Sequence, residues 1–361
     1  MKLKHYKALD GVRAIAALMV MFFHFFKDVE AKNGVLVIIK KYSVFGQTGV
    51  SLFFVLSGFL ISRILLNTKQ SPTYFINFYI RRALRIFPLY YLYLIIFYFI
   101  LPFLEKNPIV PFDQQLAFWI YLQNIAATFN WDVNGPQHFW SLAVEEHFYL
   151  FWPFLIYFLD KNKIKIAIFV LIVLAFITRI LLIKNNLGVF YFTLSRMDEL
   201  AIGAFLAILE IEGKLISANS KKFLLLFCLV LLPTVVLWIF TSNLGMVSVQ
   251  ISKFILFAFC YFGLIGFIIT AKESFWIKKI LNHKALTYTG KISYGLYVYH
   301  PMCFLLLNEY FIIDSVFLLF ILSFSFCFLT ASLSFYLFES KFLVLKKNFE
   351  NNYAKLKEAA T

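Results

Sequence analysis

Two ionisable side chains lie inside the first apolar stretch of the chain, LDGVRAIAALMVMFFHF at residues 9–25. Arg13 and His24 are eleven residues apart, so at about 100° per residue they share one helix face, about 16 Å apart along the axis. Ionisable groups in membrane spans are costly and usually face a protein interior or a wet cavity. An imidazole can also act as general base on a hydroxyl near neutral pH. This face therefore predicts one wall of a reaction cavity.

The depth of the two groups follows from the helix rise. If Leu9 marks the inner boundary, Arg13 lies about 6 Å and His24 about 22 Å into the hydrocarbon region. The arginine is then near the cytoplasm and the histidine in the outer third. The structural alternative is that Arg13 extends to lipid headgroups and that His24 hydrogen-bonds within the bundle.

Acidic residues recur at a similar depth in two later apolar segments. In WSLAVEEHFYL, Glu145 and Glu146 lie about 9 Å inside the outer end of their predicted helix, in the same layer as His24. In SRMDELAIG, Arg196 and Asp198 lie at a comparable level. We expect these residues to line the cavity. The alternative is an ion pair of Arg196 with Asp198 or Glu145 that holds helices together.

The inner side carries the basic and aromatic candidates. Arg82 and Arg85 in FYIRRALRIFPLYYLY are one turn apart, and their forked donors suit phosphate or pyrophosphate. Positive anchors for a span would show the same pattern. Ser57 allows close helix packing or a narrow passage. In SYGLYVYHP, Tyr294 and His300 belong to a polar strip that we expect to line the same cavity from its cytoplasmic half.

The composition indicates the elements that position these groups. Hydrophobic residues make up 61% of the 361 residues and charged residues 15%, with 47 Phe, which is more apolar surface than a soluble core can hide. Windows of about 20 apolar residues predict an all-α fold, a polytopic membrane helical bundle of about ten transmembrane helices. The predicted spans are 9–26, 44–66, 86–104, 139–159, 166–183, 190–211, 222–241, 248–270, 293–311 and 315–338.

The distribution of the net charge of +15 indicates topology. With the N-terminus in the cytoplasm, 24 of the 34 Lys and Arg fall in inner segments and six in outer ones. This asymmetry is typical of the positive-inside rule. We therefore predict cytoplasmic N- and C-termini, contact with the lipid bilayer and no nucleic-acid partner.

Three further features complete the prediction. The short, polar segment 113–129 is interpreted as a helix at the outer surface or dipping part-way, with an eleventh span as the alternative. The four cysteines fall in apolar spans without CxxC spacing, which is typical of small buried hydrophobes. The six histidines lack metal-ligand spacing, so no metal site is expected.

The motifs together resemble a known family. The order LDGVRAIAALMVMFFHF, FFVLSGFLI, FYIRRALRIFPLYY, WSLAVEEHFYL, RMDELAIGA and SYGLYVYHP is similar to the acyltransferase-3 family of membrane-bound bacterial O-acyltransferases, over about residues 5–340. The resemblance implies transfer of an acyl group, usually acetyl, from cytoplasmic acyl-CoA to a hydroxyl of a cell-envelope carbohydrate or related acceptor. It implies catalytic roles for Arg13, His24 and Glu145. It implies donor binding by Arg82 and Arg85, with which we group Ser57.

We accordingly expect a membrane acyltransferase domain at 5–340 and a short basic cytoplasmic tail at 341–361, in the bacterial cytoplasmic (inner) membrane. The expected partners are acyl-CoA as co-substrate, with no tightly bound cofactor, and a carbohydrate or glycolipid acceptor. The oligomeric state is left open. The sequence is also compatible with direct transfer or a transient acyl-histidine. The alternative function is a polytopic exporter or flippase of a glycan or lipid-linked substrate, which would also carry intramembrane charges.

Overall fold

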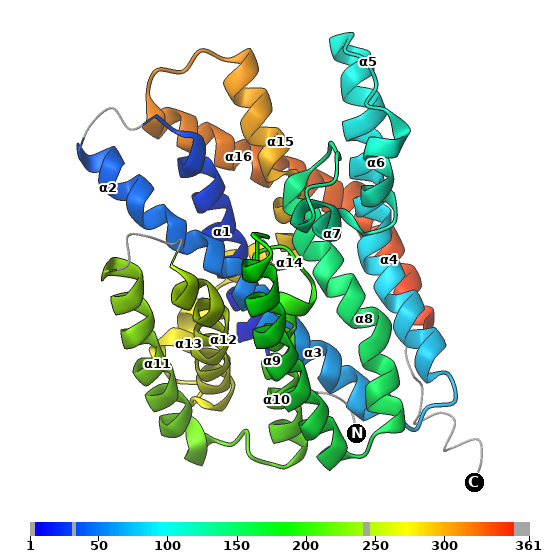
Figure 1. Cartoon of the computed structure of the whole chain (residues 1–361), viewed down its shortest axis with the longest axis vertical. Coiled ribbons are helices and arrows are strands. Elements are labelled where there is room, and N and C mark those ends of the chain that lie inside the picture. The colour runs from blue at the N-terminus through cyan, green and yellow to red at the C-terminus, as the bar shows by residue number, and fades with distance from the viewer. Residues whose placement is uncertain (1–3, 31–33, 241–245, 350–361) are drawn as a thin grey trace. The chain divides into compact units, whose positions relative to one another are not determined.

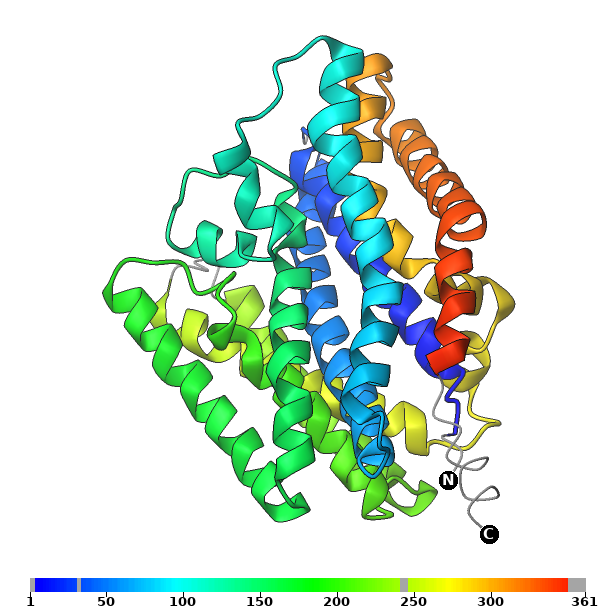
Figure 2. The same cartoon turned by 90° about the vertical axis from the view of Figure 1, so that its right-hand side faces the viewer.

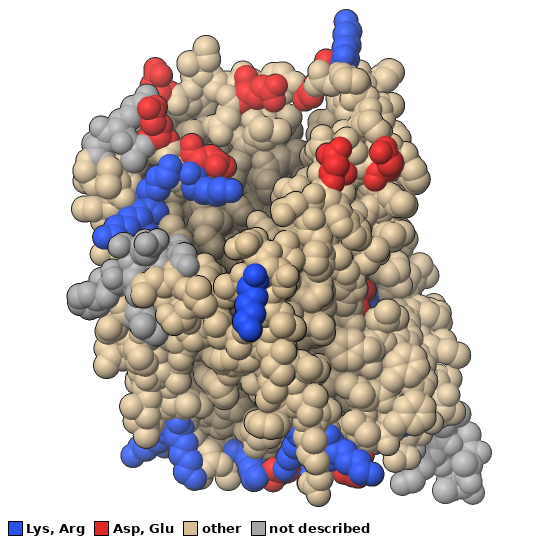
Figure 3. Space-filling model, in the orientation of Figure 1, with Lys and Arg blue, Asp and Glu red and all other residues tan. Residues whose placement is uncertain are grey.

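The computed structural model describes residues 4–30, 34–240 and 246–349, and all regular secondary structure in these ranges is helical (Figures 1 and 2). Within the described residues, seven helical stretches are long and apolar enough to cross a membrane. They are Ala8–Asp28, Gly34–Thr68, Tyr74–Glu105, Lys161–Lys184, Ser217–Val236, Val247–Thr270 and Val316–Leu345. Large areas of the visible face carry no charged side chain, as a lipid-facing surface requires (Figure 3).

Each of the ten predicted spans coincides at least in part with a helix. The three outside the set of seven are α8 (Trp140–Phe158), α10 (Met197–Ile211) and α15 (Ser293–Tyr310). Two acidic residues interrupt the apolar surface of α8, and α10 has only 15 residues. The all-α, multi-pass architecture is therefore established, while the number ten and the orientation of the termini stay predictions.

The chain forms two compact units, each assembled from separate segments. Among the described residues, unit 1 contains 51–74 and 94–275 together with Lys4, and unit 2 contains 5–50, 75–93 and 276–349. No shift in composition marks this division in the sequence, which we interpreted as a single membrane domain. Residues 350–361 of the predicted tail lie outside the described residues, and its first part forms the short helix α17 (Ser340–Leu345).

Unit 1 is built around α10. This helix contacts α9 (Lys161–Lys184) and α12 (Val247–Thr270), and α11 (Ser220–Phe240) packs along α12. Eleven of the 15 residues of α10 are buried, including Asp198 and Glu199. A helix so enclosed must pair its charges within the protein.

Two glycines bring α3 (Thr48–Thr68) and α10 into backbone contact within unit 1. A β-carbon at Gly58 would overlap the backbone of Leu200, and one at Gly203 would overlap the backbone of Val55. Small residues at a crossing point allow this close approach between membrane helices. The FFVLSGFLI and RMDELAIGA motifs thus meet through their glycines.

The segment 113–129 is not one continuous helix. It folds as α6 (Phe112–Trp119) and α7 (Gln123–Thr128), and the chain breaks between them at Tyr121, whose φ is 59°. At 1.5 Å per residue the longer of the two is only about 12 Å long, far short of the hydrocarbon core. Residues 113–129 therefore do not form an eleventh span as a single helix. The break at Tyr121 was not predicted.

Unit 2 is built around α1 (Ala8–Asp28), which holds both Arg13 and His24. This helix contacts α2 (Gly34–Ser43), α13 (Trp276–Leu281), α14 (Lys284–Lys291) and α15. The part of α4 (Tyr74–Ile95) within 75–93 also belongs to unit 2. In Figure 2, α15 runs beside α16 (Val316–Ser334), which continues into a π-helical turn, Phe335–Glu339.

Glycines also fix α1 within unit 2. At four positions a β-carbon would overlap the main chain of a neighbouring segment, so the backbones touch directly. The pairs are Gly11 with Leu281, Gly290 with Asp10, Gly46 with Met19, and Gly49 with Ala16. These contacts hold the N-terminal half and the middle of the helix that carries the two candidate residues.

Candidate active site

The two histidines of unit 2 meet directly. His24 Nδ1 lies 2.9 Å from His300 Nε2, and His300 is fully buried while His24 is half-buried. The pair joins α1 to α15, as expected if both helices line one cavity. The contact places the two imidazoles at the same level, and the cytoplasmic position expected for the SYGLYVYHP strip stays a prediction.

A cluster of aromatic rings packs on the His300 end of the histidine pair. The ring of Phe304 lies 5.8 Å from that of His300, and Phe25, next to His24 in sequence, lies 5.6 Å from Phe304. Phe320 of α16 packs 5.2 Å from Phe25. Hydrogen bonds are stronger in such an apolar setting than in water, so the contact between the imidazoles is held firmly.

Arg13 has a carboxylate partner on its own helix that was not predicted. Its Nη1 lies 2.5 Å from Asp10 Oδ1, one turn earlier on α1, and Asp10 also lies 3.4 Å from His5. Both Arg13 and Asp10 are 23% exposed. Because α1 is continuous from Ala8 to Asp28, Arg13 and His24 stand at two levels of one helix, as predicted.

The basic residues of α4 also belong to unit 2. The Arg82 guanidinium lies 5.9 Å from the Phe78 ring, and both Arg82 and Arg85 are half-buried. Tyr294 at the start of α15 donates a 2.8 Å hydrogen bond to the carbonyl of Ile86. Its hydroxyl therefore ties α15 to α4 beside the RxxR motif.

A buried carboxylate near Arg85 was missed. Glu339 ends the π-helical turn after α16, is 8% exposed, and interacts electrostatically with Arg85. Ser334 donates to it at 3.3 Å, and it packs against Gly295 of α15. Single π-helical turns are frequent at functional sites. The signal was present as an acidic residue inside an apolar run, FYLFESKFL.

The acidic residues of α8 lie in unit 1. Glu145 and Glu146 are half-buried, and the neighbouring Tyr149 hydroxyl lies 2.5 Å from the Ser57 hydroxyl of α3. Ser57 thus contributes to helix packing inside this unit. The predicted pairing of Glu145 with His24 concerns residues of different units and stays a prediction.

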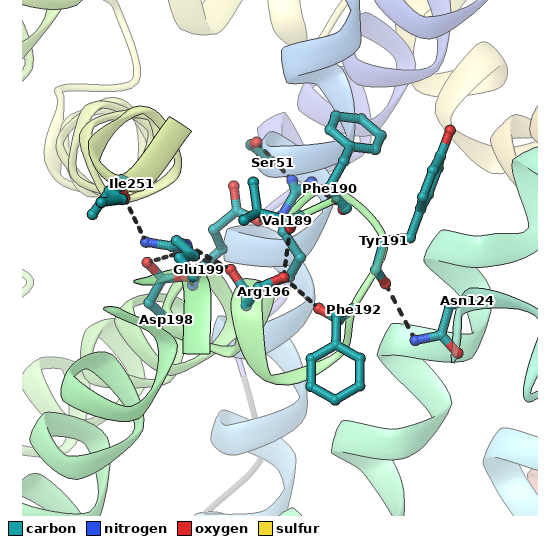
Figure 4. A network of polar contacts seen from close by, with 12 residues as sticks. Ser51, Asn124, Val189, Phe190, Tyr191, Phe192, Arg196, Asp198, Glu199 and Ile251 are labelled. Atoms are coloured by element: carbon teal, nitrogen blue, oxygen red, sulfur yellow. Dashed lines mark hydrogen bonds and ion pairs between the residues drawn. The ribbon is translucent and has the colours of Figure 1, made fainter. Parts of the chain in front are cut away.

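The structural alternative named Asp198 or Glu145 as the partner of Arg196, and the structure shows a different partner. Arg196 pairs with Glu199 at 2.7 Å (Figure 4). Asp198 pairs with Arg179 of α9 at 2.5 Å. All four side chains are buried, and Arg196 also lies 3.3 Å from the hydroxyl of Ser51 in α3. The geometry fits the structural alternative, in which the charges of Arg196 and Asp198 hold helices together.

Outside these clusters, one expectation about cysteine also differs from the structure. Cys260, Cys303 and Cys327 are buried as predicted, but Cys228 on α11 is exposed on the protein surface. An exposed thiol on an apolar helix that covers the outside of unit 1 is compatible with lipid contact.

Comparison with known protein families gives a match that covers all of these motifs. A family model described as an acyltransferase domain matches residues 6–339. The chain belongs to the acyltransferase-3 family. Its motifs with Arg13, His24, Arg82, Arg85 and Glu145 all fall inside the matched range.

Several curated relatives of this acyltransferase-3 chain are O-acetyltransferases. It is 28% identical over 319 residues to the peptidoglycan O-acetyltransferase OatA of Listeria monocytogenes, which is 82% of this chain and 49% of the relative. It is 25% identical over 344 residues to the O-acetyltransferase OatA of Staphylococcus aureus strain NCTC 8325, or 86% and 52%. A putative O-acetyltransferase of S. aureus strain COL is 26% identical over 343 residues, with the same coverage. The chain thus spans about half the length of the curated relatives it matches, and no solved structure matches it significantly.

Proposed function

We propose that this acyltransferase moves an acetyl group from cytoplasmic acyl-CoA to a hydroxyl of a cell-envelope carbohydrate, with His24 as the general base. The observation that carries the proposal is the His24–His300 contact, which holds a half-buried imidazole on α1. A base must be fixed in orientation as well as present. The O-acetyltransferase relatives, one of them named for peptidoglycan, support the acceptor class.

The proposed reaction needs no reactant besides the acyl-CoA donor and the acceptor hydroxyl. The acceptor hydroxyl gives its proton to an imidazole nitrogen of His24 while its oxygen forms a C–O bond to the thioester carbonyl carbon. The C–S bond then breaks, the electron pair leaves on sulfur, and the imidazolium returns the proton to the CoA thiolate. A transient acyl-histidine would use the same nitrogen as nucleophile.

The donor is proposed to enter beside the arginines of unit 2. Arg82 and Arg85 present forked donors that suit the phosphates of CoA, and Arg13 lies on the helix that carries His24. The flexible pantetheine arm can carry the thioester across much of the bilayer. Entry of the donor from the cytoplasm requires that Arg82 and Arg85 lie on the cytoplasmic side. With that topology, a thiol tag introduced at Asn162 should be accessible from the cytoplasm and one at Asn107 from outside.

The test uses the full chain purified into lipid nanodiscs with radiolabelled acetyl-CoA and soluble peptidoglycan fragments. We expect label to pass to the fragments with release of free CoA. His24→Gln keeps size and hydrogen bonding but loses basicity, so turnover should fall by roughly 10²–10⁴-fold while acetyl-CoA still binds. His283→Gln, at the exposed start of α14, is the matched control and should keep full activity.

Two results would contradict the proposal. Near-normal transfer by well-folded His24→Gln would remove the histidine from the chemistry. Glycan movement across a proteoliposome membrane without any release of CoA would favour the exporter instead. If transfer occurs to other envelope glycans but not to peptidoglycan fragments, only the acceptor changes.

A further inference from the structure

The surroundings of His300 determine which of its nitrogens carries the proton. Its Nδ1 lies 2.8 Å from the carbonyl oxygen of Tyr297 and 3.1 Å from that of Leu296. A carbonyl oxygen only accepts hydrogen bonds, so Nδ1 of His300 must be the protonated nitrogen.

The sequence explains why a main-chain carbonyl is available there. Pro301 follows His300 inside α15 and has no N–H to donate to the carbonyl four residues earlier, that of Tyr297. A buried carbonyl without a donor is destabilising. The imidazole of His300 supplies the missing donor, so the HP dipeptide locks the ring in place.

The opposite nitrogen of His300 faces His24. His300 has no exposed surface and lies among the rings of Tyr297 and Phe304, and an imidazolium is costly in such a site. In the neutral ring, with Nδ1 protonated, Nε2 is a lone-pair acceptor. The atom 2.9 Å from it, His24 Nδ1, must then be the donor.

We propose that His300 is a positioning residue that holds His24 in the tautomer with Nδ1 protonated and Nε2 unprotonated. The catalytic consequence rests on the proposed function: Nε2 of His24 is then the nitrogen that accepts the proton of the acceptor hydroxyl. The chain of contacts runs from the Tyr297 carbonyl through His300 to His24. It orients the base much as a buried partner orients the imidazole of a hydrolase triad, but with a neutral group in place of a carboxylate.

The first measurement reads the tautomer directly. Full-length protein with ¹⁵N-labelled histidine is placed in lipid nanodiscs, and the His24 signals are assigned by their loss in His24→Gln. We expect Nδ1 of His24 to be protonated and Nε2 unprotonated. In His300→Phe, which keeps a ring but loses the acceptor, His24 should shift toward the Nε2-protonated form, whereas His300→Gln retains an acceptor and should shift less. His283→Gln should leave the His24 signals unchanged.

The second measurement is the rate of acetyl transfer. We expect kcat to fall at least about tenfold in His300→Phe, with an unchanged KM for acetyl-CoA. This loss should be smaller than the ~10⁴-fold loss that the wrong tautomer causes in a serine protease triad. Pro301→Ala restores a competing N–H for the Tyr297 carbonyl. It should therefore change the tautomer in the same direction as His300→Phe, and less strongly.

Failure of this inference is distinguishable from failure of the proposed function. An Nε2-protonated His24 in the wild-type protein, or an unchanged tautomer in His300→Phe and His300→Gln, would overturn the assignment whatever the activity. A tautomer that changes as expected while acetyl transfer continues undiminished would uphold the assignment and refute His24 as the base.

Discussion

Arg179 and Asp198 form an ion pair of 2.5 Å in which neither side chain is exposed. Arg179 also donates to the carbonyls of Ser195 and Ile251, so one guanidinium links α9, α10 and α12 within unit 1. Removing one partner of a buried pair leaves an uncompensated charge. We expect Asp198→Asn and Arg179→Met each to destabilise the protein by about 3–5 kcal/mol, measured by unfolding in detergent.

The double variant Arg179→Met with Asp198→Leu tests this explanation. It removes both charges, so it should recover part of the loss seen in either single variant. A double variant that is no better than the singles would show that the carbonyl contacts of Arg179, not the ion pair, determine stability.

The contact of Gly58 with Leu200 and of Gly203 with Val55 gives a second prediction. Gly203→Ala adds a methyl group where the backbone of α3 already lies, so the helices must separate or shift. We expect a loss of roughly 1–3 kcal/mol. The control is Gly188→Ala, where a β-carbon meets nothing within 4 Å; its thermal unfolding midpoint should stay equal or rise slightly. Equal midpoints for Gly203→Ala and the control would refute the tight crossing.

Arg85 provides a test of donor binding. Lys keeps the positive charge but loses the fork that grips phosphate oxygens, so Arg85→Lys should weaken acetyl-CoA binding by about tenfold, the effect of one charge-assisted hydrogen bond. The measurement is isothermal titration in nanodiscs. Arg81→Lys, on the same helix but outside the RxxR motif, is the matched control. If both variants bind acetyl-CoA with wild-type affinity, the arginines serve only as anchors for the span.

The carboxyl group of Glu212 should make the stability of the folded protein depend on pH. Hydrogen bonds from Lys165 and Lys214 lower the pKa of this carboxyl from 4.5 to about 2. A carboxyl with a lowered pKa in the folded state stabilises the protein above its unfolded pKa, and this contribution disappears as the pH falls from about 4.5 to about 2. The unfolding midpoints of wild type and Glu212→Gln should therefore differ by a constant amount above pH 5.5 or so and converge near pH 2.

The side chains concerned are near the surface, so the difference should be small and should shrink with added salt. A difference between wild type and Glu212→Gln that is independent of pH would show that packing, not charge, distinguishes the two proteins.

The sequence predicted the helices well because a bilayer permits few alternatives for a long apolar segment. It failed where a local contact without a periodic signal decides the structure. Tyr121 breaks 113–129 by adopting a positive φ, which a residue other than glycine rarely does. The pairs of Arg196 and Asp198 were misassigned because Arg179, before the loop at 185–193, was not considered as a partner.

The residues of the candidate site could be predicted from the sequence better than the contacts between them. Helical periodicity places Arg13 and His24 on one face but does not identify the residue opposite, and His300 is 276 positions away in the chain. Glu339 was overlooked because the last apolar run was interpreted as ending before it. The HP dipeptide of α15 was a usable signal, since proline frees the carbonyl that His300 binds.

The glycine contacts of α1 have a consequence for how any catalytic cycle proceeds. Main chain lies against main chain at Gly11, Gly46, Gly49 and Gly290, so this helix cannot slide or rotate within unit 2 without prying backbones apart. His24 therefore does not move by alternating access, in which a helix carries its binding group from one membrane face to the other. If His24 is the base, as proposed, it is stationary in its unit, and the two reactants must travel to it.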